Sequence, residues 1–138
     1  MELPHREAPL ASEQGLDGLL GLELTELSAD RVRARLPVRD ELRQPLGITH
    51  GGVYAAIAES LACRGTDSAV APAGRAAVGL SNQTNLLRPI SQGRILATAV
   101  PKHRGRTTWI WEVEFLDDEQ RLCALSRVTI AVRDGAPR

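Results

Sequence analysis

The segment from Gln44 to Ser60 combines a carboxylate with groups that can bind an anion. It reads Gln-Pro-Leu-Gly-Ile-Thr-His-Gly-Gly-Val-Tyr-Ala-Ala-Ile-Ala-Glu-Ser. Gly51 and Gly52 stand where a helix is expected to begin, and the first N–H groups of a helix have no partner within it. They also lie at the positive end of the helix dipole, so they can hold an anion or a developing oxyanion. The side chains of His50 and Gln44 can add donors at the same place.

Glu59 is the unusual residue of this segment, because it stands in an alanine-rich helical run. A carboxylate on the side that faces a sheet costs free energy unless it is paired or used. Two interpretations stay open from the spacing alone. Glu59 either acts in catalysis, or it faces solvent or pairs locally with Arg64.

The spacing between Gly51 and Glu59 constrains the catalytic interpretation. Eight residues of helix separate them, which is roughly 12 Å at a rise of about 1.5 Å per residue. A carboxylate that attacks a carbonyl must approach to about 3–3.5 Å, and the oxyanion donors must also lie about 3 Å away. One copy of the helix does not satisfy both demands. The catalytic interpretation therefore predicts an obligate homo-oligomer, in which Gly51 of one subunit works with Glu59 of another.

A basic cluster, Lys102-His-Arg-Gly-Arg106, follows later in the chain. We expect it at a turn between two strands, where positive charge and free backbone N–H groups suit phosphate. The alternative is an ordinary basic hairpin on the surface.

The elements that must position these residues follow from the hydrophobic pattern. Arg31–Val38 alternates apolar and polar residues, which predicts a half-buried strand. A long helix is expected from Gly51 to Val70, with a face of small residues that suits close packing on a sheet. A short helix is expected around Leu16–Leu20, and further strands at 76–86, 94–101, 107–115 and 121–132. One long helix and five or six largely antiparallel strands make an α+β domain, with the sheet covering the helix.

Length and composition are those of a single soluble domain spanning residues 1–138, with its core at about 16–132. Seventeen Lys and Arg balance seventeen Asp and Glu, so no overall field attracts nucleic acid or a membrane surface. Aromatic residues make up 3% of the chain, which leaves few platforms for stacking bases. No run approaches the roughly 20 apolar residues of a membrane span, and Met1–Pro9 lacks the apolar stretch of a signal peptide.

Cys63 and Cys123 have no CxxC partner and no metal-ligand neighbours, so we expect both to pack as small hydrophobic residues. This usage fits a reducing compartment and predicts a cytoplasmic protein. His5, His50 and His103 lack ligand spacing, so no metal site is expected.

Several motifs carry a resemblance to a known family: His50-Gly-Gly followed by Ala58-Glu-Ser60, then Asn85-Leu-Leu-Arg-Pro89, Gly93 and His103-Arg-Gly-Arg-Thr107. In this order and spacing they resemble the hotdog-fold acyl-CoA thioesterases, in particular the group of the Arthrobacter-type 4-hydroxybenzoyl-CoA thioesterase and the phenylacetate-pathway thioesterases. The proofreading thioesterase of enterobactin synthesis and the menaquinone-pathway thioesterase share the pattern. The likeness runs from about Leu16 to Val132.

The resemblance implies a long central helix wrapped by an antiparallel sheet, two such units forming one continuous sheet, and often a dimer of dimers. It implies that Glu59 attacks the thioester of an acyl-CoA substrate or activates water. The Gly51 N–H would polarise the carbonyl, helped by Gln44 and His50 of the facing subunit. No cofactor is implied besides the CoA of the substrate. The CoA-binding residues implied by position are Arg106, Thr107, Arg88, Lys102, His103 and Asn85.

Cys63 departs from the family pattern, because relatives often carry Ser or Thr one helical turn after the glutamate. A thiol is a weaker hydrogen-bond partner than a hydroxyl, so the acyl group or the need for this contact differs here. Cys63 and Tyr54 are candidates for lining the acyl pocket. A nucleophilic role for Cys63 is disfavoured, since no histidine lies near it in the sequence.

Two alternatives to hydrolysis belong to the same fold. The first is a non-catalytic acyl-CoA-binding module, although sensors of this fold usually carry a DNA-binding segment for which this chain has no room. The second is an acyl-CoA dehydratase or hydratase, which generally needs a paired His and Asp that the sequence does not offer.

Overall fold

The computed structural model describes residues 14–135, so the expectations for Met1–Pro9 lie outside the described part of the chain. The described helices are α1 (Leu16–Leu20) and α2 (Gly51–Val70), with short 3-10 helices η2 (Asp40–Leu42) and η3 (Ala71–Ala73). The strands are β1 (Glu23–Leu27), β2 (Val32–Pro37), β3 (Arg75–Leu86), β4 (Arg94–Arg104), β5 (Thr108–Leu116) and β6 (Leu122–Asp134).

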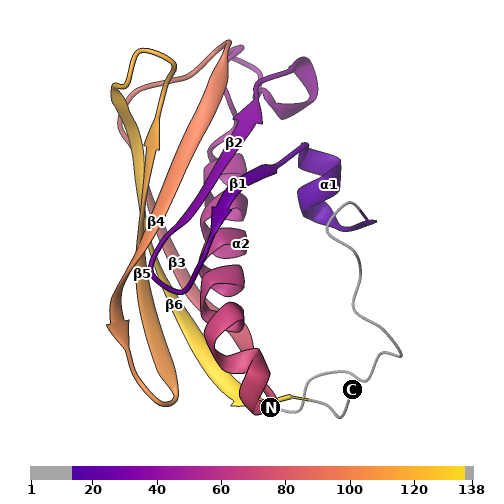
Figure 1. The fold of residues 1–138 in the computed structure, drawn as a ribbon. Helices are drawn as coiled ribbons and strands as arrows, with labels where there is room; N and C mark the ends of the chain where they lie inside the picture. The colour runs from indigo at the N-terminus through magenta and orange to yellow at the C-terminus, as the bar shows by residue number, and fades with distance from the viewer. Residues whose placement is uncertain (1–13, 136–138) are drawn as a thin grey trace.

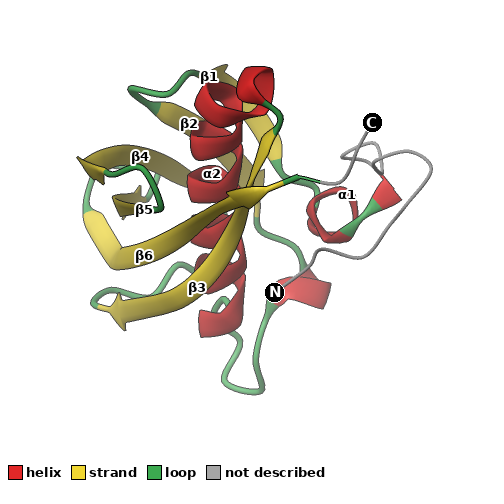
Figure 2. Cartoon of the chain, turned by 90° about the horizontal axis from the view of Figure 1, so that it is seen from below, coloured by secondary structure: helices red, strands yellow, loops and turns green. Residues whose placement is uncertain are grey.

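All six strands form one antiparallel sheet in the order β1-β2-β4-β5-β6-β3. The sheet curves around α2, as the two views in Figures 1 and 2 show, and α1 lies on the side of α2 away from the sheet. This arrangement is the hotdog fold, and it confirms the predicted α+β class. The edges of the sheet are β1 and β3, and β3 is the longer edge, with 12 residues against five.

The core lies between α2 and the concave face of the sheet. Alternate residues of β5 are buried, as the pattern predicted, and Trp111 and Phe115 are fully enclosed. Gly65 lets the helix approach, because a Cβ at this position would lie 2.3 Å from Cη2 of Trp111. The indole N–H of Trp111 donates to Oγ1 of Thr66 at 2.8 Å, so the buried polar atom of this large side chain is satisfied.

Two features of the sheet differ from the sequence-based prediction. Strand β1 was not expected, and its residues alternate only between exposed and half-buried, which leaves a weak hydrophobic pattern. Strand β4 continues to Arg104, so Lys102, His103 and Arg104 belong to the strand and the connecting turn is shorter than predicted. A bulge between Pro101 and His103 explains the continuation, because it accommodates a proline without ending the ladder. Among the described residues, no helix is long and apolar enough to cross a membrane.

Candidate active site

A tight turn precedes α2 and orients its first residues. The N–H of Gln44 donates to the carbonyl of Ile48 at 2.9 Å, and the N–H of Gly47 donates back to the carbonyl of Gln44 at 2.9 Å. Gly47 has a φ of 84°, a conformation that favours glycine. The turn delivers His50 to the N-cap position of α2.

The backbone N–H groups at the start of α2 differ in whether they already have a hydrogen-bond acceptor. Nδ1 of His50 accepts the N–H of Gly52 at 2.8 Å, and its carbonyl accepts the N–H of Val53 at 3.0 Å. Because Nδ1 is an acceptor, a neutral His50 carries its proton on Nε2 and offers a donor there. The N–H of Gly51 donates to no group within residues 14–135.

The side chain of Gln44 lies in the same turn. Its Oε1 accepts the N–H of Leu46. The NH₂ group of the same side-chain amide is a hydrogen-bond donor. One short segment therefore offers three donor groups, from Gln44, His50 and Gly51.

Glu59 lies in the middle of α2, exposed, with its side chain against β3. A Cβ at Gly79 would lie 2.3 Å from Oε1 of Glu59, so the carboxylate occupies the space that a side chain at this position would fill. Arg64 pairs with Asp17 of α1 at 2.8 Å rather than with Glu59. Among the described residues, Glu59 forms no ion pair.

Gly79 was missed as a site residue in the sequence. An isolated glycine within a strand pattern signals a bulge or a close approach, and that signal was present. The structure has both, because the register of β3 against β6 shifts between Gly79 and Ser81.

Three contacts fix how α2 runs along β3. A Cβ on Gly51 would lie 2.6 Å from Cδ1 of Leu86, Asn82 Nδ2 donates to the carbonyl of Ala55 at 2.9 Å, and Glu59 lies against Gly79. The helix and the strand therefore run antiparallel, and Gly51 and Glu59 contact different parts of β3. The axial separation of roughly 12 Å expected from the helical rise holds for this chain.

Cys63 lies one turn beyond Glu59. Burial, reinforced by the charge of Glu59, raises the pKa of the Cys63 thiol to about 12, while a hydrogen bond with the Gly79 backbone acts in the opposite direction. The sulfur is therefore a neutral thiol at physiological pH and a poor nucleophile.

Tyr54 lies under a small hollow beside the start of α2. Burial raises its pKa to about 12, and its ring meets Phe115 edge-on with centroids 5.3 Å apart. The hollow, about 230 Å³, lies between this tyrosine and the segment Leu86–Pro89. Tyr54 thus lines a mostly apolar surface near Gly51, whereas Cys63 lies further along the helix.

The cations of the basic cluster 102–106 and the predicted CoA-binding residue Arg88 differ in their partners. Lys102 lies 3.8 Å from Glu112, and Arg104 pairs with Asp30 and lies over the ring of Trp109. Arg88 and Arg106 are exposed and form no ion pair with any residue between 14 and 135. These two guanidinium groups remain available for phosphate.

Arg88 and Arg106 lie at opposite ends of β3. The carbonyl of Arg106 accepts a hydrogen bond from the guanidinium of Arg75, at the first residue of the strand. The N–H of Arg88 donates to the carbonyl of Cys123, just beyond the last residue of the strand. An extended strand of this length spans roughly 36 Å. Thr107 lies with Arg106, because its carbonyl accepts the N–H of Val132.

The remaining predicted CoA-binding residues are His103 and Asn85. His103 is exposed near the β4–β5 turn, with Nε2 2.8 Å from where a Cβ of Gly105 would lie. Asn85 lines a hollow with Gln83 and Arg127. Because Asn82 faces the helix and side chains alternate along a strand, Asn85 lies on the sheet face away from α2.

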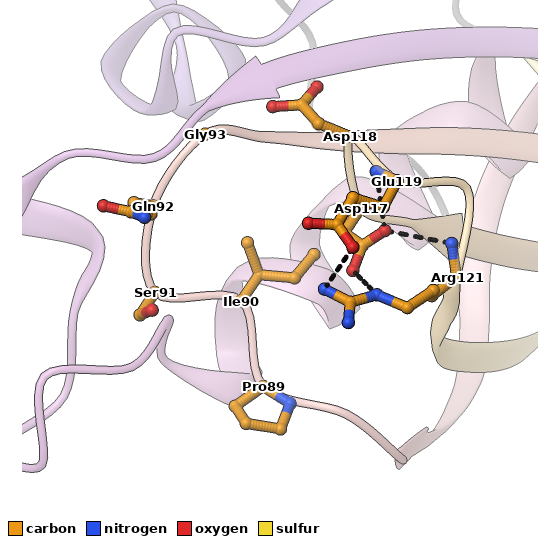
Figure 3. A pocket seen from close by; sticks show the side chains of 9 residues that line it. All are labelled: Pro89, Ile90, Ser91, Gln92, Gly93, Asp117, Asp118, Glu119 and Arg121. Atoms are coloured by element: carbon orange, nitrogen blue, oxygen red, sulfur yellow. Dashed lines mark hydrogen bonds and ion pairs between the residues drawn. The ribbon is translucent and has the colours of Figure 1, made fainter.

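The hollow in Figure 3 lies between residues 89–93 and the β5–β6 turn, and has a volume of about 390 Å³. The Arg121 backbone N–H, at 2.9 Å, and the Arg121 guanidinium lower the pKa of Asp117. Asp118 binds Arg94, and Glu119 adds a third carboxylate to the lining. This surface is unsuited to phosphate. Within residues 14–135, no group of three or more His, Cys, Asp or Glu side chains is arranged to hold a metal ion.

The thioesterase superfamily model matches residues 46–124, a range that includes Gly51, Glu59, Gly79 and Arg106. The chain belongs to the thioesterase superfamily. It is therefore a member of a hydrolase family, as the resemblance of its motifs predicted.

Known proteins and solved structures resemble this chain over most of its length. The chain is 39% identical over 136 residues to protein Rv1847 of Mycobacterium tuberculosis, covering 97% of each. It is 33% identical over 119 residues to the 1,4-dihydroxy-2-naphthoyl-CoA hydrolase of Listeria monocytogenes, covering 86% of this chain and 96% of that protein. The crystal structure of thioesterase HI1161 from Haemophilus influenzae matches with a TM-score of 0.85 and 31% identity, over 92% of this chain and 88% of that one.

Proposed function

We propose that this chain hydrolyses an acyl-CoA thioester to the free acid and CoA. One observation carries the proposal: within residues 14–135, the same helix carries a Gly51 N–H without a hydrogen-bond acceptor and an exposed Glu59 carboxylate without an ion pair. The first suits a developing oxyanion, and the second suits attack on a carbonyl or activation of water. The sequence similarity to a hydrolase named for an acyl-CoA ester supports the substrate class.

The site forms between two copies of the chain. Strand β3 is the long free edge of the sheet, and such an edge offers a row of unpaired backbone groups to another strand. Antiparallel pairing of β3 with β3 of a second copy continues the sheet and produces a two-fold dimer. Two such dimers can associate further into a tetramer.

This pairing shortens the distance between the catalytic groups. With a two-fold axis at the centre of β3, Gly79 of one copy lies opposite Asn82 of the other, because both are equally far from the centre. Within each copy, Asn82 is bonded to Ala55, and Glu59 lies against Gly79. Glu59 of the first copy therefore lies at the level of Ala55 of the second copy. Ala55 is one helical turn from Gly51, and the axial offset falls from roughly 12 Å to roughly 6 Å.

The same two-fold axis brings Arg88 and Arg106, the candidates for phosphate binding, close together. It places Leu86 of one copy opposite Arg75 of the other. Arg88 of the first copy then lies near Arg106 and Thr107 of the second. Two guanidinium groups that are far apart in one chain become neighbours beside the reaction centre, where CoA carries its phosphates.

Hydrolysis at this site needs no cofactor beyond the CoA of the substrate. The thioester carbonyl accepts hydrogen bonds from Gly51 N–H, with Gln44 and His50 as further donors. Glu59 of the other copy either attacks the carbonyl carbon or takes a proton from the attacking water. In either case the carbon–sulfur bond breaks and CoA leaves as a thiolate, which is then protonated. Direct attack by Glu59 leaves its carboxylate joined to the acyl group as an anhydride, which water then hydrolyses to the free acid and the Glu59 carboxylate. Attack by water gives the free acid directly, and the proton taken by Glu59 is returned to solvent.

The proposal is tested by the release of free CoA thiol from a panel of aryl-CoA and alkyl-CoA esters. Glu59→Gln keeps the size of the side chain and removes the carboxylate, so kcat should fall by about 10³-fold or more. Glu114→Gln is the matched control, because Glu114 is exposed on β5 and forms no ion pair within residues 14–135. It should retain wild-type activity.

Two results would contradict the proposal in different ways. Wild-type protein that binds CoA and turns over no ester would favour the non-catalytic binding module. Full activity of Glu59→Gln would show that another group performs the chemistry.

A further inference from the structure

The bulge in β3 determines which residue lies beneath Glu59. Before the bulge, Ala77 and Gly79 pair with Val132 and Ile130, which are buried on the helix side of the sheet. After the bulge, the inward positions are even-numbered, as the bond from Asn82 to the helix demonstrates. A one-residue shift exchanges the two faces of a strand. Without the bulge, Leu80 would take the inward position next to Glu59.

Leu80 instead turns outward and is 55% exposed, and Gly79 takes the inward position. Gly79 has no side chain, and the Glu59 carboxylate fills the resulting space. A Cβ there would lie 2.3 Å from Oε1, 3.1 Å from Cδ and 3.3 Å from Cγ of Glu59. Three atoms of one side chain thus lie against a single glycine.

Cys63 contributes to the same arrangement. It follows Glu59 by four residues, so both side chains lie on one face of α2. The Gly79 backbone lies near enough to its sulfur to lower the pKa of the thiol, against the larger effect of burial. The helix therefore contacts Gly79 twice, through the Glu59 carboxylate and through the Cys63 thiol.

We propose that Gly79 is a positioning residue, and that the β3 bulge exists to seat the Glu59 carboxylate at the free edge of the sheet. The inference rests on the catalytic role of Glu59 proposed above. The bulge removes a leucine from beneath the carboxylate, and the glycine leaves room for it. The carboxylate is thereby held at the edge strand, where the second copy brings its Gly51.

Gly79→Ala is the direct test, because it adds one methyl group in the space of the carboxylate. A misplacement of about 1 Å can cost about 10²-fold in rate, so kcat should fall by that order while KM stays within about twofold. Gly65→Ala is the matched control. Its Cβ would also clash, with Trp111, but away from Glu59. It should lower the melting temperature without a comparable loss of kcat.

A double-mutant cycle separates positioning from general damage. Glu59→Asp shortens the side chain by one methylene, so it should relieve the clash in the Gly79→Ala background. The loss caused by Glu59→Asp should therefore be smaller in that background than in the wild type. Equal losses in both backgrounds, or wild-type kcat for Gly79→Ala, would overturn the assignment.

A crystal structure of the Gly79→Ala variant tests the inference without relying on activity. The Glu59 carboxylate should be displaced from β3, whereas the bulge and the Cys63 contact remain. A carboxylate that keeps its place would refute the positioning role, even if hydrolysis is confirmed. A displaced carboxylate in a protein that hydrolyses no ester would instead count against the proposed function alone.

Discussion

At the scale of single residues, the candidate site depends on groups that have no partner among residues 14–135. Glu59 is a carboxylate without an ion pair in the described chain, although Arg64 is only five residues away. Arg64 is held by Asp17, so its guanidinium does not occupy the Glu59 carboxylate. Cys63 cannot replace it as a nucleophile, because burial keeps the pKa of its thiol at about 12.

The role of the Gly51 N–H as an oxyanion donor can be tested with two substitutions that differ in whether the N–H is kept. Gly51→Pro removes the N–H, and proline is well tolerated at the first helical position, so α2 should still form. Loss of one oxyanion donor should lower kcat by about 10²- to 10³-fold. Gly51→Ala retains the N–H and introduces the same close contact with Leu86.

Steady-state kinetics of the two Gly51 variants should therefore differ strongly. Gly51→Ala should keep most of the activity, since the side chain of Leu86 is flexible and can move. Equal activity of the proline and alanine variants would mean that the Gly51 amide is not the donor.

At the scale of elements, α1 secures α2 from the side opposite the sheet (Figure 1). The carboxylate of Asp17 accepts hydrogen bonds from Ser60 Oγ at 2.6 Å and from Arg64 Nη2 at 2.8 Å, and this side chain is only 15% exposed. Ser60 and Arg64 directly follow Glu59 and Cys63 in the sequence. This cluster therefore fixes the rotation of α2 that turns Glu59 toward β3.

Asp17→Asn should destabilise the fold, because it leaves the partly buried Arg64 without a carboxylate. We expect a loss of about 1–2 kcal/mol in the free energy of unfolding, measured in urea. Asp30→Asn is the control, since Asp30 is 81% exposed in its pair with Arg104. Exposed pairs contribute between about 0 and 1 kcal/mol, so a larger effect of Asp30→Asn would contradict the interpretation.

The elements that could be predicted from the sequence were those whose hydrophobic or small residues recur at a regular spacing. Strand β5 alternates cleanly, and α2 carries its small residues at helical spacing, so both followed from local pattern. Strand β1 has no such pattern and forms because β2 offers it a partner. The Asp17 cluster joins residues more than 40 positions apart, and no local spacing reveals such a contact.

The candidate site was predictable to a similar degree. The rise of a helix was sufficient to separate Gly51 from Glu59, and the family motifs indicated their roles. The place of Gly79 was not predictable in the same way, because it depends on the register of β3 against β6. The glycine itself was visible in the sequence, but the bulge that turns it toward Glu59 is a property of the sheet.

At the scale of the whole molecule, every candidate group is divided along β3. The donors near Gly51 and Arg88 lie at one end, Arg106 and Thr107 lie at the other, and Glu59 lies near the middle. In the proposed dimer, a two-fold axis through β3 would bring these groups together, whereas within one described chain they lie apart along the strand. The long free edge of the sheet and the chemistry of the site thus point to the same assembly.

Complementation between two inactive variants tests this two-chain site most directly. Glu59→Gln and Gly51→Pro are co-expressed with different tags, and two affinity steps isolate dimers that contain one copy of each. Such a dimer has one site with both groups intact and one site with neither, so it should show about half of the wild-type activity. If each chain held a complete site, the mixed dimer would be no more active than its parents, and that result would contradict the account.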